Sequence, residues 1–181
     1  MAIRSQGRWI TWANLLSVLR LATVVPCVLA VLGLHWRIAA ACFVVAVATD
    51  LLDGPLARRR GEASALGGLF DHGSDAIFVS SSLMALAMLD RVPTILPLLV
   101  VAAFLQYVFD SQALAGKSLR TSQLGRWNGI GYYVLVGIPV ISEALELGWP
   151  PGTWVMLIGW ILVLSTAASI ADRARALLTR S

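Results

Sequence analysis

The chain has 181 residues, of which 58% are hydrophobic and 13% are charged, and its formal net charge at pH 7 is +4. Soluble domains carry about 25% charged residues, so this composition excludes an ordinary soluble globular protein. Because a membrane-spanning helix needs about 20 apolar residues, a chain of this length has room for six spans and short loops. We therefore expect an all-α integral membrane protein with six transmembrane helices and a single domain, residues 1–181.

The first apolar segment follows a short basic stretch. This juxtamembrane segment, residues 1–13, contains Arg4 and Arg8 among apolar and aromatic residues, which is typical of a short helix lying in the membrane interface. The apolar run after it is about 20 residues long, longer than the hydrophobic region of a cleavable signal peptide, and so predicts a retained span. Gly, Pro and charged residues separate five further spans. The six predicted spans are residues 15–34, 37–57, 68–89, 93–115, 128–147 and 153–172.

Basic residues are distributed unequally on the two sides of these spans. Eleven of the fourteen Lys and Arg residues fall on one side and two on the other, while Arg20 lies within the first span. The positive-inside rule places the richer side in the cytoplasm. We therefore expect a multi-pass protein of the inner (cytoplasmic) membrane with both termini in the cytoplasm. The isoelectric point of about 9.7 reflects an excess of basic residues. Membrane topology and contacts with anionic lipid headgroups account for these residues, so no nucleic-acid partner is expected.

Five of the ten acidic residues fall in one window, residues 50–75, beside the predicted spans, and four of the five are aspartates. Asp50 and Asp53 are spaced i/i+3, and Asp71 and Asp75 are spaced i/i+4, so each pair shares one helix face. Ionised groups at membrane depth cost about 2.5–3.5 kcal/mol each, so such a cluster indicates a function. The loop between the second and third spans brings both pairs together on the cytoplasmic side. Carboxylates in this arrangement suit Mg²⁺, and two ions could clamp a phosphoryl group during displacement.

The residue types between the aspartates carry a resemblance to a known family. The window reads Asp50-x2-Asp53-Gly54-x2-Ala57-Arg58-x8-Gly67-x3-Asp71-x3-Asp75 and resembles the signature of the CDP-alcohol phosphotransferase family, integral membrane enzymes of phospholipid biosynthesis. The predicted six-span layout is similar to that of the family. The stretch from Thr11 through Asn14 to Arg20 resembles the one before the first span of bacterial phosphatidyltransferases.

The resemblance implies transfer of a phosphatidyl group from CDP-diacylglycerol to an alcohol, with release of CMP, by a homodimer in the lipid bilayer. It implies that Asp50 and Asp71 each bridge two Mg²⁺ ions, with Mn²⁺ as an alternative ion. Asp53 would hold the first ion, and Asp75 would touch the second and act as general base toward the acceptor hydroxyl. The positions that the resemblance implies for binding the donor are Asn14, Gly54, Ala57, Arg58, Ser64 and Gly67.

The signature leaves the acceptor alcohol open. Lys117, Arg120 and Arg126 lie in the second cytoplasmic loop, where they are candidates to bind a phosphorylated acceptor or simply positive-inside residues. The run from Gly116 to Gln123 resembles, with a spacing one residue different, a segment of bacterial phosphatidylglycerophosphate synthases, although Ala76 stands where those enzymes have lysine. Glycerol 3-phosphate is therefore the leading acceptor, and inositol phosphate, serine and a phospholipid are the alternatives.

A cation or proton transporter is the competing class, because intramembrane carboxylates can also carry ions. The sequence has no evident inverted repeat or paired broken helices, which disfavours a transporter. Three other polar residues, Arg20, His72 and Asp110, are candidates to contact the site. His72 points about 100° away from Asp71 on a helix, and Asp110 could contact an acceptor or pair with Arg20 or Lys117.

Overall fold

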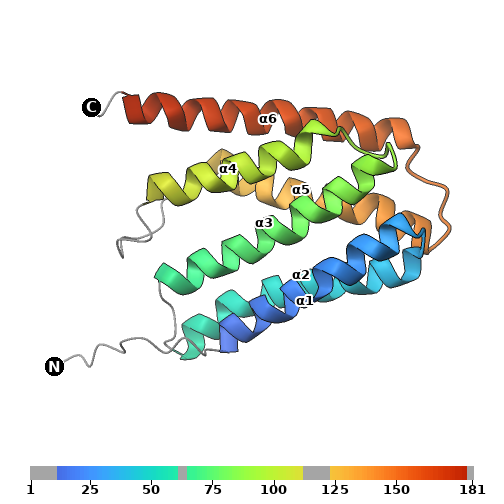
Figure 1. Ribbon diagram of the computed structural model, residues 1–181, viewed down its shortest axis with the longest axis horizontal. Coiled ribbons are helices and arrows are strands. Elements are labelled where there is room, and N and C mark those ends of the chain that lie inside the picture. Colours follow the sequence, from blue (N-terminus) through green and yellow to red (C-terminus); the bar gives the residue numbers. More distant parts are fainter. Residues whose placement is uncertain (1–11, 61–64, 112–122, 179–181) are drawn as a thin grey trace.

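The computed structural model describes residues 12–60, 65–111 and 123–178. Its regular elements are all helices (Figure 1), which confirms the expected all-α class. In chain order the helices are α1 (Trp12–Leu32), α2 (Trp36–Arg60), α3 (Ala65–Met88), α4 (Ile95–Ser111), α5 (Gln123–Ala144) and α6 (Gly152–Leu178).

The lengths and surfaces of these helices suit a lipid environment. Three helices, α1, α2 and α6, are long and apolar enough to cross a membrane, and α4 contains a shorter apolar stretch. Large apolar side chains cover the outside of the bundle, including Leu51, Phe109 and Leu164, with 67%, 78% and 70% of their surface exposed. Water would disfavour so much exposed apolar surface, whereas acyl chains accommodate it.

The helix boundaries differ from the predicted spans at several ends. Trp12 and Ala13, which we expected in the juxtamembrane segment, form the first turn of α1, and residues 1–11 lie outside the described part of the chain. Helix α5 begins earlier than the predicted span, at Gln123, and α6 continues to Leu178. The predictions ended each span where its apolar run meets polar residues, Gly or Pro, but backbone hydrogen bonding continues into these polar turns.

The helices run alternately up and down, so α2, α4 and α6 end at the same side of the bundle where α1, α3 and α5 begin (left in Figure 1). Helix α1 packs along both α2 and α3, whereas α2 and α3 touch each other at few positions. Helix α5 packs against α2 and α6, and α4 packs against α3 and α6. The acidic window therefore lies where the first three helices and α5 meet.

At the opposite end, the three short connections share one type of helix cap. Leu34, Asp90 and Glu146 follow α1, α3 and α5 with φ values of 57°, 54° and 54°. After Leu34, the His35 amide donates to the carbonyl oxygen of Ala30 at 2.7 Å, the long bond of a Schellman motif. The left-handed position after α1 is thus occupied by Leu34 and not by the adjacent Gly33.

Two glycines on α5 allow its close approach to neighbouring helices. An added Cβ at Gly137 would lie 2.7 Å from Cζ of Phe43 on α2, and one at Gly131 would lie 2.7 Å from Cδ2 of Leu162 on α6. Small residues bring membrane helices together in this way. The close contact with α2 carries Tyr133, one turn before Gly137, toward the acidic residues.

Candidate active site

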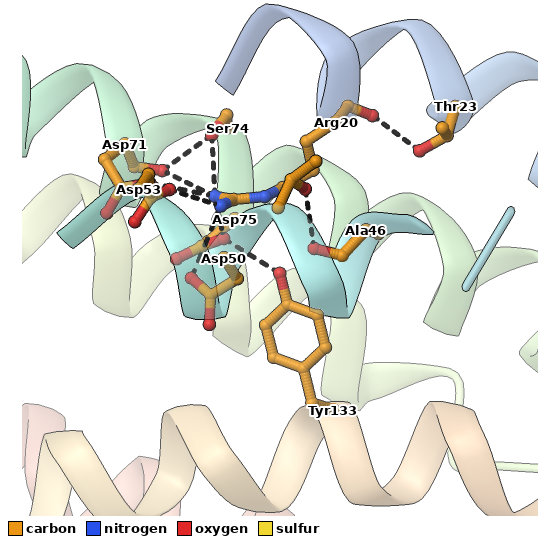
Figure 2. Close-up of polar contacts among 10 residues, drawn as sticks. Arg20, Thr23, Ala46, Asp50, Asp53, Asp71, Ser74, Asp75 and Tyr133 are labelled. Carbon is orange, nitrogen blue, oxygen red and sulfur yellow. Dashed lines mark hydrogen bonds and ion pairs between the residues drawn. The ribbon is translucent and has the colours of Figure 1, made fainter. Parts of the chain in front are cut away.

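The four aspartates of α2 and α3 converge on the guanidinium group of Arg20, a fully buried side chain of α1 (Figure 2). Nη2 of Arg20 lies 2.6 Å from Oδ2 of Asp53 and 3.4 Å from Oδ1 of Asp50. Nη1 lies 3.0 Å from Oδ1 of Asp71 and also pairs with Oδ1 of Asp75. The structure thus brings together all four carboxylates that the sequence singled out.

Two hydroxyl groups complete this network. Ser74 Oγ accepts a hydrogen bond from Nη1 of Arg20 at 3.0 Å and donates one to the backbone carbonyl of Asp71 at 2.8 Å. The hydroxyl of Tyr133, on α5, donates to Oδ1 of Asp75 at 2.8 Å (Figure 2). Asp75 is therefore held from both α1 and α5.

The donor set fits a divalent cation. Ligand atoms of Asp50, Asp53 and Asp71 all lie within 4.8 Å of one another, and so do those of a second group, Asp71, His72 and Asp75. Four carboxylates share one guanidinium group in this cluster, so their formal negative charge is only partly balanced. Oxygen ligands with excess negative charge are what Mg²⁺ and Mn²⁺ prefer.

A cavity of about 470 Å³ opens beside the carboxylates, lined by side chains of α2 to α6. Asp50, Asp71 and Asp75 contribute to its wall, whereas Asp53 is buried outside it. The other polar or aromatic side chains of the wall include His72, Phe104, Gln106, Tyr107, Arg126, Asn128, Tyr132, Tyr133, Thr166, Ser169 and Arg173. A reacting molecule in this cavity would have carboxylates on one side and arginines elsewhere in the wall.

Two further side chains of the cavity wall, His72 and Arg173, contact the ring of Tyr107. His72 meets the ring of Tyr107 edge-on, with centroids 5.5 Å apart, so it faces the cavity despite its offset from Asp71. The guanidinium carbon of Arg173 lies 5.6 Å from the centre of the same tyrosine ring. Arg126, the one predicted acceptor residue within the described chain, also lines the wall.

The residues expected to bind the donor lie elsewhere, at the adjoining ends of the first three helices. Asn14 is in the first turn of α1, Gly67 is in the first turn of α3, and Gly54, Ala57 and Arg58 are in the last turns of α2. None of these five residues is part of the cavity wall. The Arg58 side chain folds back over Gly54, with Nη1 3.4 Å from the place of an added Cβ. The carboxylates thus lie between these helix ends and the cavity.

Some predicted residues cannot be placed in this site. Ser64, Lys117 and Arg120 lie outside the described residues, as does the side chain of Asp110. Two contributors, Tyr133 and Arg173, were not predicted from the sequence, and Arg20 was left as a candidate without an assigned partner among the four aspartates. A signal existed for Arg20, because an arginine within a span needs an acidic partner. Tyr133 had no such signal, and Arg173 was counted only as a positive-inside residue.

The comparison with protein families agrees with the signature. A family model described as CDP-alcohol phosphatidyltransferase matches residues 10–166, which include the acidic window and all four aspartates. The chain therefore belongs to the CDP-alcohol phosphatidyltransferase family. Membership supports a membrane-embedded transferase of phospholipid synthesis that uses a CDP-alcohol. Enzymes of this family generally depend on a divalent metal ion. Among curated proteins, none matches the chain significantly.

Proposed function

We propose that this protein transfers a phosphatidyl group from CDP-diacylglycerol to a small phosphorylated alcohol and releases CMP. The observation that carries the proposal is the convergence of Asp50, Asp53, Asp71 and Asp75 beside a cavity that also has arginines in its wall. The family signature supports a donor site at the ends of α1, α2 and α3. The cavity on the other side of the carboxylates offers room for the acceptor.

The carboxylates would hold two Mg²⁺ ions, or Mn²⁺ in their place. By the family pattern, Asp50 and Asp71 would contribute to both metal sites, Asp53 would contribute to the first and Asp75 to the second. When bound, the ions neutralise charge on the diphosphate of the donor and favour departure of CMP. The protein would hold the four carboxylates of α2 and α3 at the relative positions that metal binding requires.

Asp75 is our candidate for the general base. Within the described residues, its contacts with Arg20 and Tyr133 both end on Oδ1, so we assign Oδ2 to the proton of the acceptor hydroxyl. As that proton moves to Oδ2, the acceptor oxygen bonds to the phosphorus of the phosphatidyl group. The bond from this phosphorus to the CMP oxygen breaks, and CMP leaves with the electron pair.

The charge of the cavity favours an anionic acceptor. Arg126 from the start of α5 and Arg173 from the end of α6 both contribute to the wall, and guanidinium groups bind phosphate through paired hydrogen bonds. Lys117 and Arg120, in the segment between α4 and α5, would add to the same pocket. We propose glycerol 3-phosphate as the acceptor, ahead of inositol phosphate. Serine would offer the arginines only a carboxylate in place of a phosphate, and an uncharged alcohol would offer them no anionic group.

The helix ends that carry the aspartates also carry many basic residues, including Arg58, Arg59 and Arg60 at the end of α2. The positive-inside rule therefore supports a site that opens to the cytoplasm, with both termini on that side of the inner membrane. We further propose a homodimer, as the family resemblance implies.

Product analysis with a set of acceptors tests this function. The purified protein in nanodiscs is incubated with CDP-diacylglycerol, Mg²⁺ and one of glycerol 3-phosphate, inositol phosphate, serine or phosphatidylglycerol, and the lipid product is identified by mass spectrometry. We expect CMP and phosphatidylglycerophosphate with glycerol 3-phosphate. Turnover with serine alone would overturn the anionic acceptor but keep the donor chemistry, and absence of CMP with every acceptor would overturn both.

A further inference from the structure

We infer that Arg20 is a positioning residue whose guanidinium group sets the two aspartate pairs in register for metal binding. The inference rests on the metal site of the proposed function. It concerns a residue outside the acidic signature, on a different helix, and assigns it a role in the geometry of the site.

The two terminal nitrogens of Arg20 are divided between the two helices that supply the carboxylates. Nη2 contacts Asp50 and Asp53 of α2, while Nη1 contacts Asp71, Ser74 and Asp75 of α3. The guanidinium group is planar and its nitrogens keep a fixed separation. One side chain therefore fixes the distance and angle between the two pairs (Figure 2).

Packing between α2 and α3 does not provide this constraint directly. The two helices are consecutive, but they touch each other at few positions, whereas α1 packs extensively along both. Arg20 lies on α1 with no exposed surface. The carboxylates of α2 and α3 are thus aligned through the third helix, and Arg20 is the side chain that connects them.

The contacts of Arg20 leave room for ligation by the same carboxylates. Arg20 uses one oxygen of each group: Oδ1 of Asp50, Oδ2 of Asp53, Oδ1 of Asp71 and Oδ1 of Asp75. Asp50, Asp53 and Asp71 each keep a second oxygen that could bind an ion, and Oδ2 of Asp75 remains for the second ion and the acceptor proton. A residue that orients metal ligands in this way would act as second-shell partners do, and loss of such partners typically lowers metal affinity by about 10- to 100-fold.

Two substitutions separate geometry from charge. Arg20→Lys keeps the positive charge but replaces the planar fork with a single ammonium group, which cannot place separate nitrogens on α2 and α3. Arg20→Gln removes the charge. If Arg20 acted only as a repelling cation, Arg20→Lys would bind metal normally and Arg20→Gln would bind it more tightly. If Arg20 positions the ligands, both variants bind metal more weakly.

The test measures binding of Mn²⁺ alone, without donor or acceptor, from the loss of the free-ion signal in electron paramagnetic resonance. We expect the dissociation constant to rise at least tenfold in both Arg20→Lys and Arg20→Gln. The control is Arg37→Gln, at an arginine whose side chain is 84% exposed beside Glu146, and its affinity should equal that of the wild type. Melting temperature and size-exclusion profiles are recorded on every sample.

The possible results are distinct. Unchanged Mn²⁺ affinity in folded Arg20→Lys, or tighter binding in Arg20→Gln, overturns the positioning role, even if the melting temperature falls. If Arg20→Gln does not fold, the decision rests on Arg20→Lys together with Ser74→Ala, which removes an acceptor of Nη1 and should weaken Mn²⁺ binding by a smaller factor. Failure of the wild type itself to bind Mn²⁺ would contradict the proposed metal site rather than the role of Arg20 alone.

Discussion

Tyr133 on α5 donates a 2.8 Å hydrogen bond to Oδ1 of Asp75 on α3. The tyrosine ring stacks on Phe78 of α3 and tilts against Phe43 of α2, with centroid distances of 6.2 and 6.4 Å. Its hydroxyl group is therefore held by packing from two helices besides its own. This arrangement fixes the orientation of the carboxylate that we propose as the general base.

Replacement of Tyr133 by phenylalanine should lower kcat by roughly tenfold and leave the KM for CDP-diacylglycerol nearly unchanged. A hydrogen bond to a charged group contributes about 1.5–3 kcal/mol, and 1.4 kcal/mol corresponds to a factor of ten. Steady-state kinetics measure both constants. The matched control is Tyr132→Phe, because the Tyr132 hydroxyl contacts Thr166 Oγ1 at 2.6 Å rather than a carboxylate. Equal losses of kcat in the two variants would contradict a specific role for Tyr133.

Asp75→Asn should reduce kcat much more than it weakens binding of the cytidine donor. An amide keeps the size of the side chain but cannot accept the hydroxyl proton, and proton transfer matters only in the transition state. Donor binding is measured by equilibrium titration and kcat by CMP release. A variant that lost donor binding but kept a normal kcat would show that Asp75 is a binding ligand and that another group is the base.

Arg126→Ala and Arg173→Ala should each raise the KM for glycerol 3-phosphate by about 10- to 100-fold, because each removes charged hydrogen bonds to phosphate. The KM for the donor should barely change. Arg37→Ala serves as the control, since Arg37 belongs to an exposed ion pair with Glu146. Normal acceptor kinetics in both cavity variants would remove the phosphate pocket from this mechanism.

Gly137→Ala should destabilise the protein by about 1–3 kcal/mol, as expected for overpacking of a close helix contact. The added Cβ would lie 2.7 Å from Cζ of Phe43 and 2.9 Å from its Cε1. Gly129→Ala is the control on the same helix, since nothing lies within 4 Å of its added Cβ. Thermal unfolding in detergent compares the two. A melting temperature equally low in both variants would point to helix propensity or insertion rather than to the Phe43 contact.

The helix order and the grouping of the aspartates could be predicted from the sequence because both depend on local periodicity. Apolar runs separated by Gly, Pro and charged residues define the helices. The spacings of Asp50 with Asp53 and of Asp71 with Asp75 define shared helix faces. The start of α1 at Trp12 was not predicted, since apolar length alone does not locate the first hydrogen-bonded turn.

The contacts of Arg20, Tyr133 and Arg173 could not be predicted because they depend on how distant helices pack. Arg20 meets Asp75 across 55 positions of sequence, and Tyr133 meets it across 58. Spacing along one helix does not say which neighbouring helix faces an aspartate. Arg173 follows a long apolar run, where the positive-inside rule explains a basic residue equally well, and only the packing of α6 places it in the cavity wall.

The most direct test of the central claim is metal-dependent release of CMP from CDP-diacylglycerol by the wild type and by four single variants: Asp50→Asn, Asp53→Asn, Asp71→Asn and Asp75→Asn. Membrane insertion of the variants is checked in parallel and should be intact, because neutral side chains insert more easily than charged ones. We predict release by the wild type with Mg²⁺, loss in EDTA, recovery when Mg²⁺ is restored, and a sharp loss in each variant. Full CMP release in EDTA, or by Asp50→Asn, would contradict a metal-dependent transferase site at these carboxylates.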